Sequence, residues 1–128
     1  MRLSEEAPAR RVIALDDSRT VLATVRNAFE KLGLEVTTAE DPSELTPEEF
    51  RRADLIVVDV QMVHVFGDDI VSFLRDSWQI DTPIFLYSSL PQEDLDRRAT
   101  AAGADGAVCK SLGVDALVDR VKHLLVAA

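Results

Sequence analysis

The short apolar run from Leu55 to Val58 is the feature that most constrains the fold. A strand with one face in water alternates apolar and polar residues, whereas a strand covered on both faces is apolar throughout. Four residues are also too few for a buried helix, which favours a strand. A chain that contains such a strand needs other elements packed on each side of its sheet.

The rest of the chain alternates between short apolar runs and segments of helical periodicity. Four further runs predict strands, at 12–15, 34–38, 84–87 and 106–109. Helical spacing of apolar residues, or a helix-capping pattern, predicts five helices, at 21–32, 46–49, 70–74, 91–102 and 114–125. Such alternation implies βαβ crossovers. The expected fold class is therefore α/β, with a three-layer, doubly wound, five-stranded parallel sheet flanked by five helices.

Length and charge narrow the class of protein. A chain of 128 residues suggests one domain, expected at 11–128 after a loose N-terminal arm at 1–10. The net charge of -9 argues against binding to nucleic acid or to an anionic membrane surface. We expect no membrane span and no signal peptide, because no long apolar run is present. The single cysteine, Cys109, excludes an internal disulfide, favours a reducing, cytoplasmic setting and is expected in the core.

Polar side chains follow four of the five predicted strands. Asp16 and Asp17 follow the first strand, Asp59 the third, Ser88 the fourth and Lys110 the fifth. In open α/β sheets, ligands bind beyond the carboxyl ends of the strands. We therefore expect these side chains to gather at one edge of the sheet.

Three carboxylates at one edge would repel each other, and a divalent cation would remove that conflict. Oxygen ligands suit Mg²⁺ best, and Ca²⁺ or Mn²⁺ less specifically. Magnesium held by one or two carboxylates commonly awaits a phosphate, and Lys110 and Ser88 add a charge and a hydroxyl for phosphoryl oxygens. An aspartate can itself be the nucleophile. The residues thus predict a Mg²⁺-assisted phosphoryl acceptor.

With these residues in this order, the chain resembles the receiver domain of two-component response regulators over essentially its full length. The resemblance implies a flavodoxin-like fold with strand order 2-1-3-4-5. It rests on Leu15-Asp16-Asp17-Ser18, on Asp59 followed by Met62 and Gly67, on Ser88, and on Ala102-Gly103-Ala104-Asp105-Gly106 leading to Lys110.

The resemblance also implies roles for the individual residues. Asp59 would accept a phosphoryl group from a histidine kinase, a phosphotransfer protein or a small phosphodonor. Lys110 would neutralise a phosphoryl oxygen, and Ser88 would move to donate a hydrogen bond to the phosphoryl group. The implied Mg²⁺ ligands are Asp16 (partly through water), Asp17, Asp59 and the backbone carbonyl of Gln61.

Three positions depart from the family pattern. Ser111 follows Lys110 where proline is usual, and Val63 follows Met62 where proline is again usual. Ala107 stands where the family usually has Tyr or Phe, whose ring turns inward on phosphorylation. Either the signal leaves by another face, or activation changes the domain little. Tyr87 and Phe85 are nearby in the sequence as candidate replacements.

Several alternatives stay open. A degenerate receiver would act as a phosphorylation-independent interaction module. A phosphatase that uses an aspartate nucleophile would need a second aspartate two residues after the first, where Ser18 or Arg19 stands, and an FMN carrier would need a first loop rich in Ser, Thr and Gly. We expect no classical enzyme. His64 is expected to be a packing residue. The output partner is another protein or a C-terminal domain, and both a homodimer and a stand-alone chain stay open.

Overall fold

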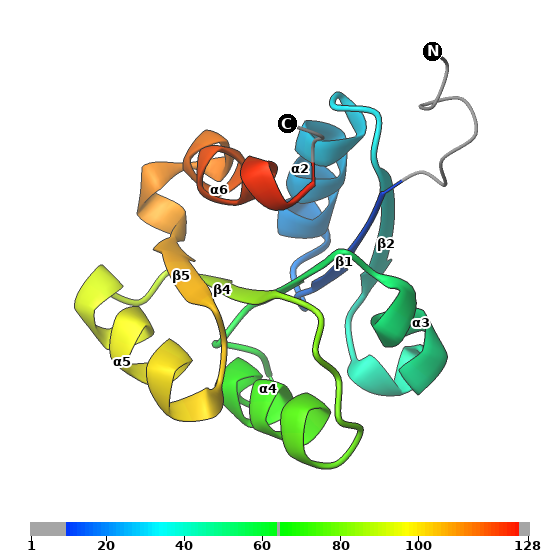
Figure 1. The fold of residues 1–128 in the computed structure, drawn as a ribbon. Helices are drawn as coiled ribbons and strands as arrows, with labels where there is room; N and C mark the ends of the chain where they lie inside the picture. Colours follow the sequence, from blue (N-terminus) through cyan, green and yellow to red (C-terminus); the bar gives the residue numbers. More distant parts are fainter. Residues whose placement is uncertain (1–9, 64, 126–128) are drawn as a thin grey trace.

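A computed structural model describes residues 10–63 and 65–125, and residues 1–9 of the expected N-terminal arm lie outside this range. The described residues form five strands and five α-helices in alternation (Figure 1). The strands are β1 (Arg11–Leu15), β2 (Glu35–Ala39), β3 (Leu55–Val58), β4 (Ile84–Ser88) and β5 (Gly106–Cys109). The helices are α2 (Arg19–Glu30), α3 (Pro47–Arg52), α4 (Gly67–Asp76), α5 (Gln92–Ala102) and α6 (Val114–Val121). Short 3-10 helices lie at Pro42–Glu44, Lys110–Leu112 and Lys122–Leu124.

The strands form one parallel sheet in the order β2-β1-β3-β4-β5, which confirms the expected topology. All four residues of β3 are buried, as the apolar run at 55–58 predicted. In the register, Ile56 of β3 pairs with Ile13 of β1 and with Ile84 of β4. Because β1 and β3 are adjacent and central, the residues that follow them emerge side by side at the carboxyl edge of the sheet.

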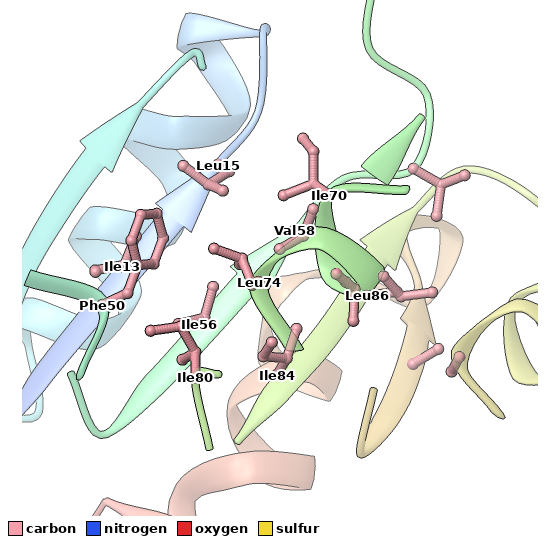
Figure 2. Close-up of a cluster of buried hydrophobic side chains, with 14 of the residues drawn as sticks. Ile13, Leu15, Phe50, Ile56, Val58, Ile70, Leu74, Ile80, Ile84 and Leu86 are labelled. Atoms are coloured by element: carbon pink, nitrogen blue, oxygen red, sulfur yellow. The ribbon is translucent and has the colours of Figure 1, made fainter. Parts of the chain in front are cut away.

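Two helical layers cover the sheet, with α3, α4 and α5 on one face and α2 and α6 on the other (Figure 1). Figure 2 shows the first core, where Phe50 of α3 and Leu74 of α4 pack against strand residues such as Ile56. The second core joins the alternate strand residues to side chains such as Phe29 of α2 and Leu117 of α6. None of the described helices has the length and apolarity that crossing a membrane requires.

Local sequence signals explain where the helices begin. The Ser18 hydroxyl accepts a hydrogen bond from the Val21 N–H at 3.3 Å, which caps α2. Thr46 and Glu49 form the reciprocal capping box that their spacing predicted for α3. Both caps satisfy N–H groups that a helix start leaves without partners.

Two predicted helix ends were wrong. Helix α2 ends at Glu30 rather than at 32, and the Leu32 side chain is 44% exposed instead of lying on the buried face. The chain turns here because Gly33 has a φ of 85°, which directs it into β2. Helix α6 ends at Val121, and a 3-10 turn carries the chain to Leu125, which is still buried.

A side chain hydrogen-bonds the backbone of each edge strand. Next to β5, the Gln92 amide donates to the Ala107 carbonyl at 2.8 Å, and its oxygen accepts from the Cys109 N–H at 2.9 Å. Next to β2, the Arg26 guanidinium donates to the Val36 carbonyl at 3.0 Å. Open strand edges favour pairing with other chains, and these contacts block part of each edge. The Gln92 contact also fixes the start of α5 against β5.

Candidate functional site at the carboxyl edge of the sheet

Four strands deliver the candidate site residues to one edge of the sheet. Asp16 and Asp59 directly follow β1 and β3, and the Asp59 N–H donates to the Leu15 carbonyl at 3.0 Å. Ser88 is the last residue of β4 and Lys110 directly follows β5. The strands are parallel, so their carboxyl ends meet, and side chains far apart in the sequence become neighbours.

Asp16, Asp17 and Asp59 form a compact acidic cluster. One carboxylate oxygen from each residue lies within 4.8 Å of the other two. Asp16 and Asp59 are each 4% exposed, whereas Asp17 is half-buried at the rim. Buried carboxylates this close are costly without a compensating charge. The donor set fits Mg²⁺, which prefers carboxylate oxygens and retains several waters, and the partial exposure of Asp17 leaves one side of the cluster open.

Lys110 supplies a positive charge inside this cluster. Its Nζ lies 2.9 Å from Asp16 Oδ2 and 3.4 Å from Asp59 Oδ2. One ammonium therefore faces two of three carboxylates, and the cluster keeps a negative balance. Burial raises the pKa of the Asp16 carboxyl above its ordinary value of 3.8, and the Asp59 charge adds to that rise. The Lys110 and Ser18 hydrogen bonds act in the opposite direction, without cancelling it.

The loop between β3 and α4 closes over the acidic cluster. Its Gln61 N–H donates to Asp59 Oδ1 at 3.2 Å, and its Val63 N–H donates to Asp17 Oδ2 at 2.8 Å. Gln61 also pairs with Phe66 in an isolated antiparallel bridge. The loop is thus tied to the cluster by its backbone. His64, expected to be a packing residue, lies outside the described residues.

Ser88 lies at the inner wall of the site and is fully buried. Its hydroxyl donates to Gln61 Oε1 at 3.5 Å, a long contact to an otherwise exposed side chain. Ser89, by contrast, is exposed. The structure therefore places Ser88, and not its neighbour, next to the loop that covers Asp59.

Two contacts of this site were missed by the sequence reasoning. A Cβ on Gly67 would lie 1.9 Å from the Asp59 carbonyl oxygen, so α4 starts directly against the backbone of Asp59. The glycine in the sequence was the available signal, because close backbone approach requires glycine. The hydrogen bond from the Val63 N–H to Asp17 also had a signal, because Val63 stands where proline is usual and proline has no N–H to donate.

Ala107 lies on the opposite face of the sheet from the proposed replacement rings. It is buried in the core beneath α5, whereas Tyr87 and Phe85 lie in the core beneath α2 and α6. Neither ring can therefore substitute for an aromatic side chain at Ala107. Tyr87 still approaches the site from its own face, since Lys110 Nζ lies 5.9 Å from its ring centroid. The peptide between Lys110 and Ser111 is trans.

Comparison with known families identifies a relationship over nearly the whole chain. A family model described as the response regulator receiver domain matches residues 12–122. The expected domain bounds of 11–128 stay a prediction. The transcriptional regulatory protein PrrA of Mycobacterium tuberculosis is 35% identical over 116 residues, which cover 90% of this chain and 49% of that protein. The response regulator SaeR of Staphylococcus epidermidis is 29% identical, with 89% of this chain and 49% of that protein covered. The chain thus spans about half the length of these relatives.

Solved structures show the same fold. The chemotaxis protein CheY4 of Vibrio cholerae superimposes with a TM-score of 0.79 and 28% identity, covering 92% of this chain and 100% of that one. The receiver domain of the Francisella response regulator 1452 gives a TM-score of 0.79 and 27% identity, covering 91% and 96%. The fold of the five-stranded sheet is therefore shared with these proteins.

Proposed function

The chain belongs to the family of response regulator receiver domains, and on that basis we propose that it accepts a phosphoryl group on Asp59 in the presence of Mg²⁺. One observation carries the proposal: the oxygens of Asp16, Asp17 and Asp59 lie within 4.8 Å of one another, and Lys110 Nζ contacts two of these carboxylates. A purely structural cluster would not need three carboxylates for one lysine. The intact cluster also argues against a degenerate, phosphorylation-independent receiver.

The proposed step is a phosphoryl transfer between the donor and a carboxylate. Asp59 attacks the phosphorus through a carboxylate oxygen. The bond from phosphorus to the donor nitrogen or oxygen breaks, and its electron pair leaves with that donor atom. Lys110, which already lies 3.4 Å from Asp59, holds a phosphoryl oxygen in place of the carboxylate oxygen. Ser88 exchanges its long contact to Gln61 for a hydrogen bond to the phosphoryl group.

Magnesium, when bound, would offset the charge of the carboxylates and of the incoming phosphoryl oxygens. The residues that would hold it are Asp16, Asp17 and Asp59, with the backbone carbonyl of Gln61 as the fourth protein ligand. The first two residues leave β1 together, and the loop that carries Gln61 is already hydrogen-bonded to Asp59 and Asp17. The short distances among the three carboxylates support this ligand set.

The partners follow from the proposed chemistry. We propose a histidine kinase or a phosphotransfer protein as the phosphodonor, and an output protein or a further domain as the receiver of the signal. One relative, PrrA, is a transcriptional regulatory protein by name, and this chain spans about half of its length, which supports an output domain as one candidate. A homodimer and a cytoplasmic setting stay predictions.

Incubation with Mg²⁺ and either acetyl phosphate or beryllofluoride tests the proposal, with intact mass as the readout for the acetyl phosphate reaction. We expect one phosphoryl group on the wild type and none on Asp59→Asn. Asp119→Asn is the matched control, because Asp119 is 72% exposed and forms an ion pair with Lys122 on its own turn. Labelling of Asp59→Asn would refute the assignment of the acceptor. No adduct on the wild type with either reagent would instead support the degenerate receiver. Trp78 fluorescence is a weaker readout, because Trp78 packs on Phe50 and Phe73 beyond the far end of α4.

A further inference from the structure

The loop that covers Asp59 is attached to α5 through three residues, Phe66, Asp68 and Arg98, which we call the Arg98 clasp. Arg98 Nη1 lies 3.0 Å from Asp68 Oδ2, and the Arg98 guanidinium lies 5.8 Å from the Phe66 ring centroid. Phe66 and Asp68 flank Gly67 at the start of α4, and Arg98 lies in the middle of α5. One side chain of α5 therefore contacts both sides of the α4 start.

The loop end of the clasp is joined directly to Asp59. Gly67 packs against the Asp59 carbonyl with no room for a Cβ, so a movement of either residue displaces the other. Phe66 pairs with Gln61, whose N–H donates to Asp59 Oδ1. A change in the charge or the hydrogen bonds of the Asp59 carboxylate therefore acts on both residues that precede Asp68.

Two groups of the clasp lie in unfavourable surroundings. The Phe66 ring is 56% exposed, although a large apolar ring is normally buried. Asp68 Oδ1 is buried and has no hydrogen-bond partner among the described residues. A buried carboxylate oxygen without a donor is unfavourable. A second arrangement that gives this oxygen a donor would therefore recover free energy. Signalling elements need two arrangements of similar free energy.

The other end of the clasp is α5, which also packs on the core through Leu95 and Ala99 and is linked to α4 where the Arg75 guanidinium donates to the Gly103 carbonyl at 2.9 Å. The start of α5 is fixed to β5 by Gln92, which hydrogen-bonds the Ala107 carbonyl and the Cys109 N–H. Beneath α5, the side chain of Ala107 is a methyl group with no rotamer to change, and the two candidate rings, Tyr87 and Phe85, lie on the other face. A route from Asp59 to α5 through the Ala107 side chain is thus absent.

We propose that Arg98 is a positioning residue that transmits phosphoryl arrival at Asp59 to α5 through Phe66 and Asp68. The inference rests on the proposed function of Asp59. The phosphoryl group displaces Gln61 and the α4 start, the contacts of Phe66 and Asp68 with Arg98 change, and α5 shifts against its fixed start at Gln92. The clasp thus replaces a ring at position 107 as the link from Asp59 to α5.

Amide chemical shifts, measured before and after addition of Mg²⁺ and beryllofluoride, test the proposal. In the wild type we expect shifts both in the loop at 59–67 and along α5 at 92–102. In Arg98→Gln the loop shifts remain and the α5 shifts fall by about half or more, because the coupling between the two segments is cut. Arg97→Gln is the matched control, since Arg97 pairs with Asp94 on α5 itself. It should keep the wild-type pattern.

A second variant guards against an effect of Arg98→Gln on folding. Phe66→Leu keeps an apolar side chain at an exposed position but removes the ring face that the guanidinium contacts. It should also reduce the α5 shifts and leave the loop shifts in place. Wild-type-sized α5 shifts in both variants, or a wild type whose α5 does not respond, would overturn the relay alone. A wild type without shifts at 59–67 would overturn the acceptor assignment, and the relay with it.

Discussion

Replacing Asp59 by asparagine is expected to stabilise the protein in the absence of divalent cations. The substitution keeps the shape of the side chain and removes one negative charge from a cluster of three carboxylates and one ammonium. Removing one partner of a buried ion pair is usually destabilising, because the other partner is left without a counter-charge. Here Lys110 keeps Asp16 at 2.9 Å, so it is not left alone.

The geometry allows the expected gain to be estimated. At an effective dielectric constant of about 20, two like charges repel by about 3.5 kcal/mol at 4.8 Å, the upper limit of the separation in the cluster, and Asp59 has two such neighbours. The attraction between Lys110 and Asp59 at 3.4 Å offsets about 5 kcal/mol of this repulsion. The balance favours asparagine by about 2 kcal/mol. In a chain of this length, that corresponds to a rise in Tm of about 7 °C.

Thermal unfolding in EDTA, followed by circular dichroism, measures this difference. Asp119→Asn serves again as the control, and we expect its stability to stay within about 0.5 kcal/mol of the wild type. A parallel series with Mg²⁺ separates charge relief from loss of a ligand. At ten times its Kd, Mg²⁺ should stabilise the wild type by about 1.4 kcal/mol, and it should stabilise Asp59→Asn less. An unchanged or lower Tm for Asp59→Asn in EDTA would refute the repulsion argument.

Three further predictions concern the surroundings of the site. Gly67→Ala should lower the unfolding free energy by about 3 kcal/mol or more in urea titrations, because its Cβ would overlap the Asp59 carbonyl. A loss as small as that of an ordinary surface substitution would contradict the close contact. Because the pKa of Asp16 is raised on folding, its ionisation destabilises the metal-free protein as pH rises through the folded value. Asp16→Asn should therefore be more stable than the wild type at neutral pH in EDTA. This difference in stability should vanish in acid, and a difference that stays the same at both pH values would refute the argument. Gln92→Leu leaves two backbone groups of β5 without partners and should cost about 2 kcal/mol in urea titrations, whereas a neutral result would show that water replaces the amide.

Much of the fold was predictable because local patterns carry it. Apolar runs located all five strands to within one residue at each end, and the run at 55–58 correctly indicated a strand buried on both faces. Capping residues such as Ser18 and Thr46 correctly marked helix starts. Helix ends were less predictable, because the exposed Leu32 has the same spacing as the buried apolar residues before it. Where the chain must turn toward the next strand, tertiary geometry overrides the periodicity.

The candidate site was predictable in its members but not in its contacts. Polar residues directly after predicted parallel strands must lie at one edge of the sheet. This rule predicted that Asp16, Asp59 and Lys110 are neighbours. Which of the carboxylates Lys110 contacts depends on the register of strands that are separated by nearly the whole chain. The close approach of Gly67 to Asp59 depends on how α4 docks, and the sequence shows only that a glycine is present.

Residue types along the chain were enough to predict the class of fold, to predict the candidate site at the carboxyl edge of the sheet, and to show that position 107 has no ring. These properties follow from residue type and short-range spacing. The tertiary structure alone decided that Tyr87 and Phe85 lie on the other face from Ala107, and that Arg98 contacts the residues on both sides of Gly67. Such contacts join residues on different elements, and those elements meet only through packing, register and helix orientation across the whole sheet.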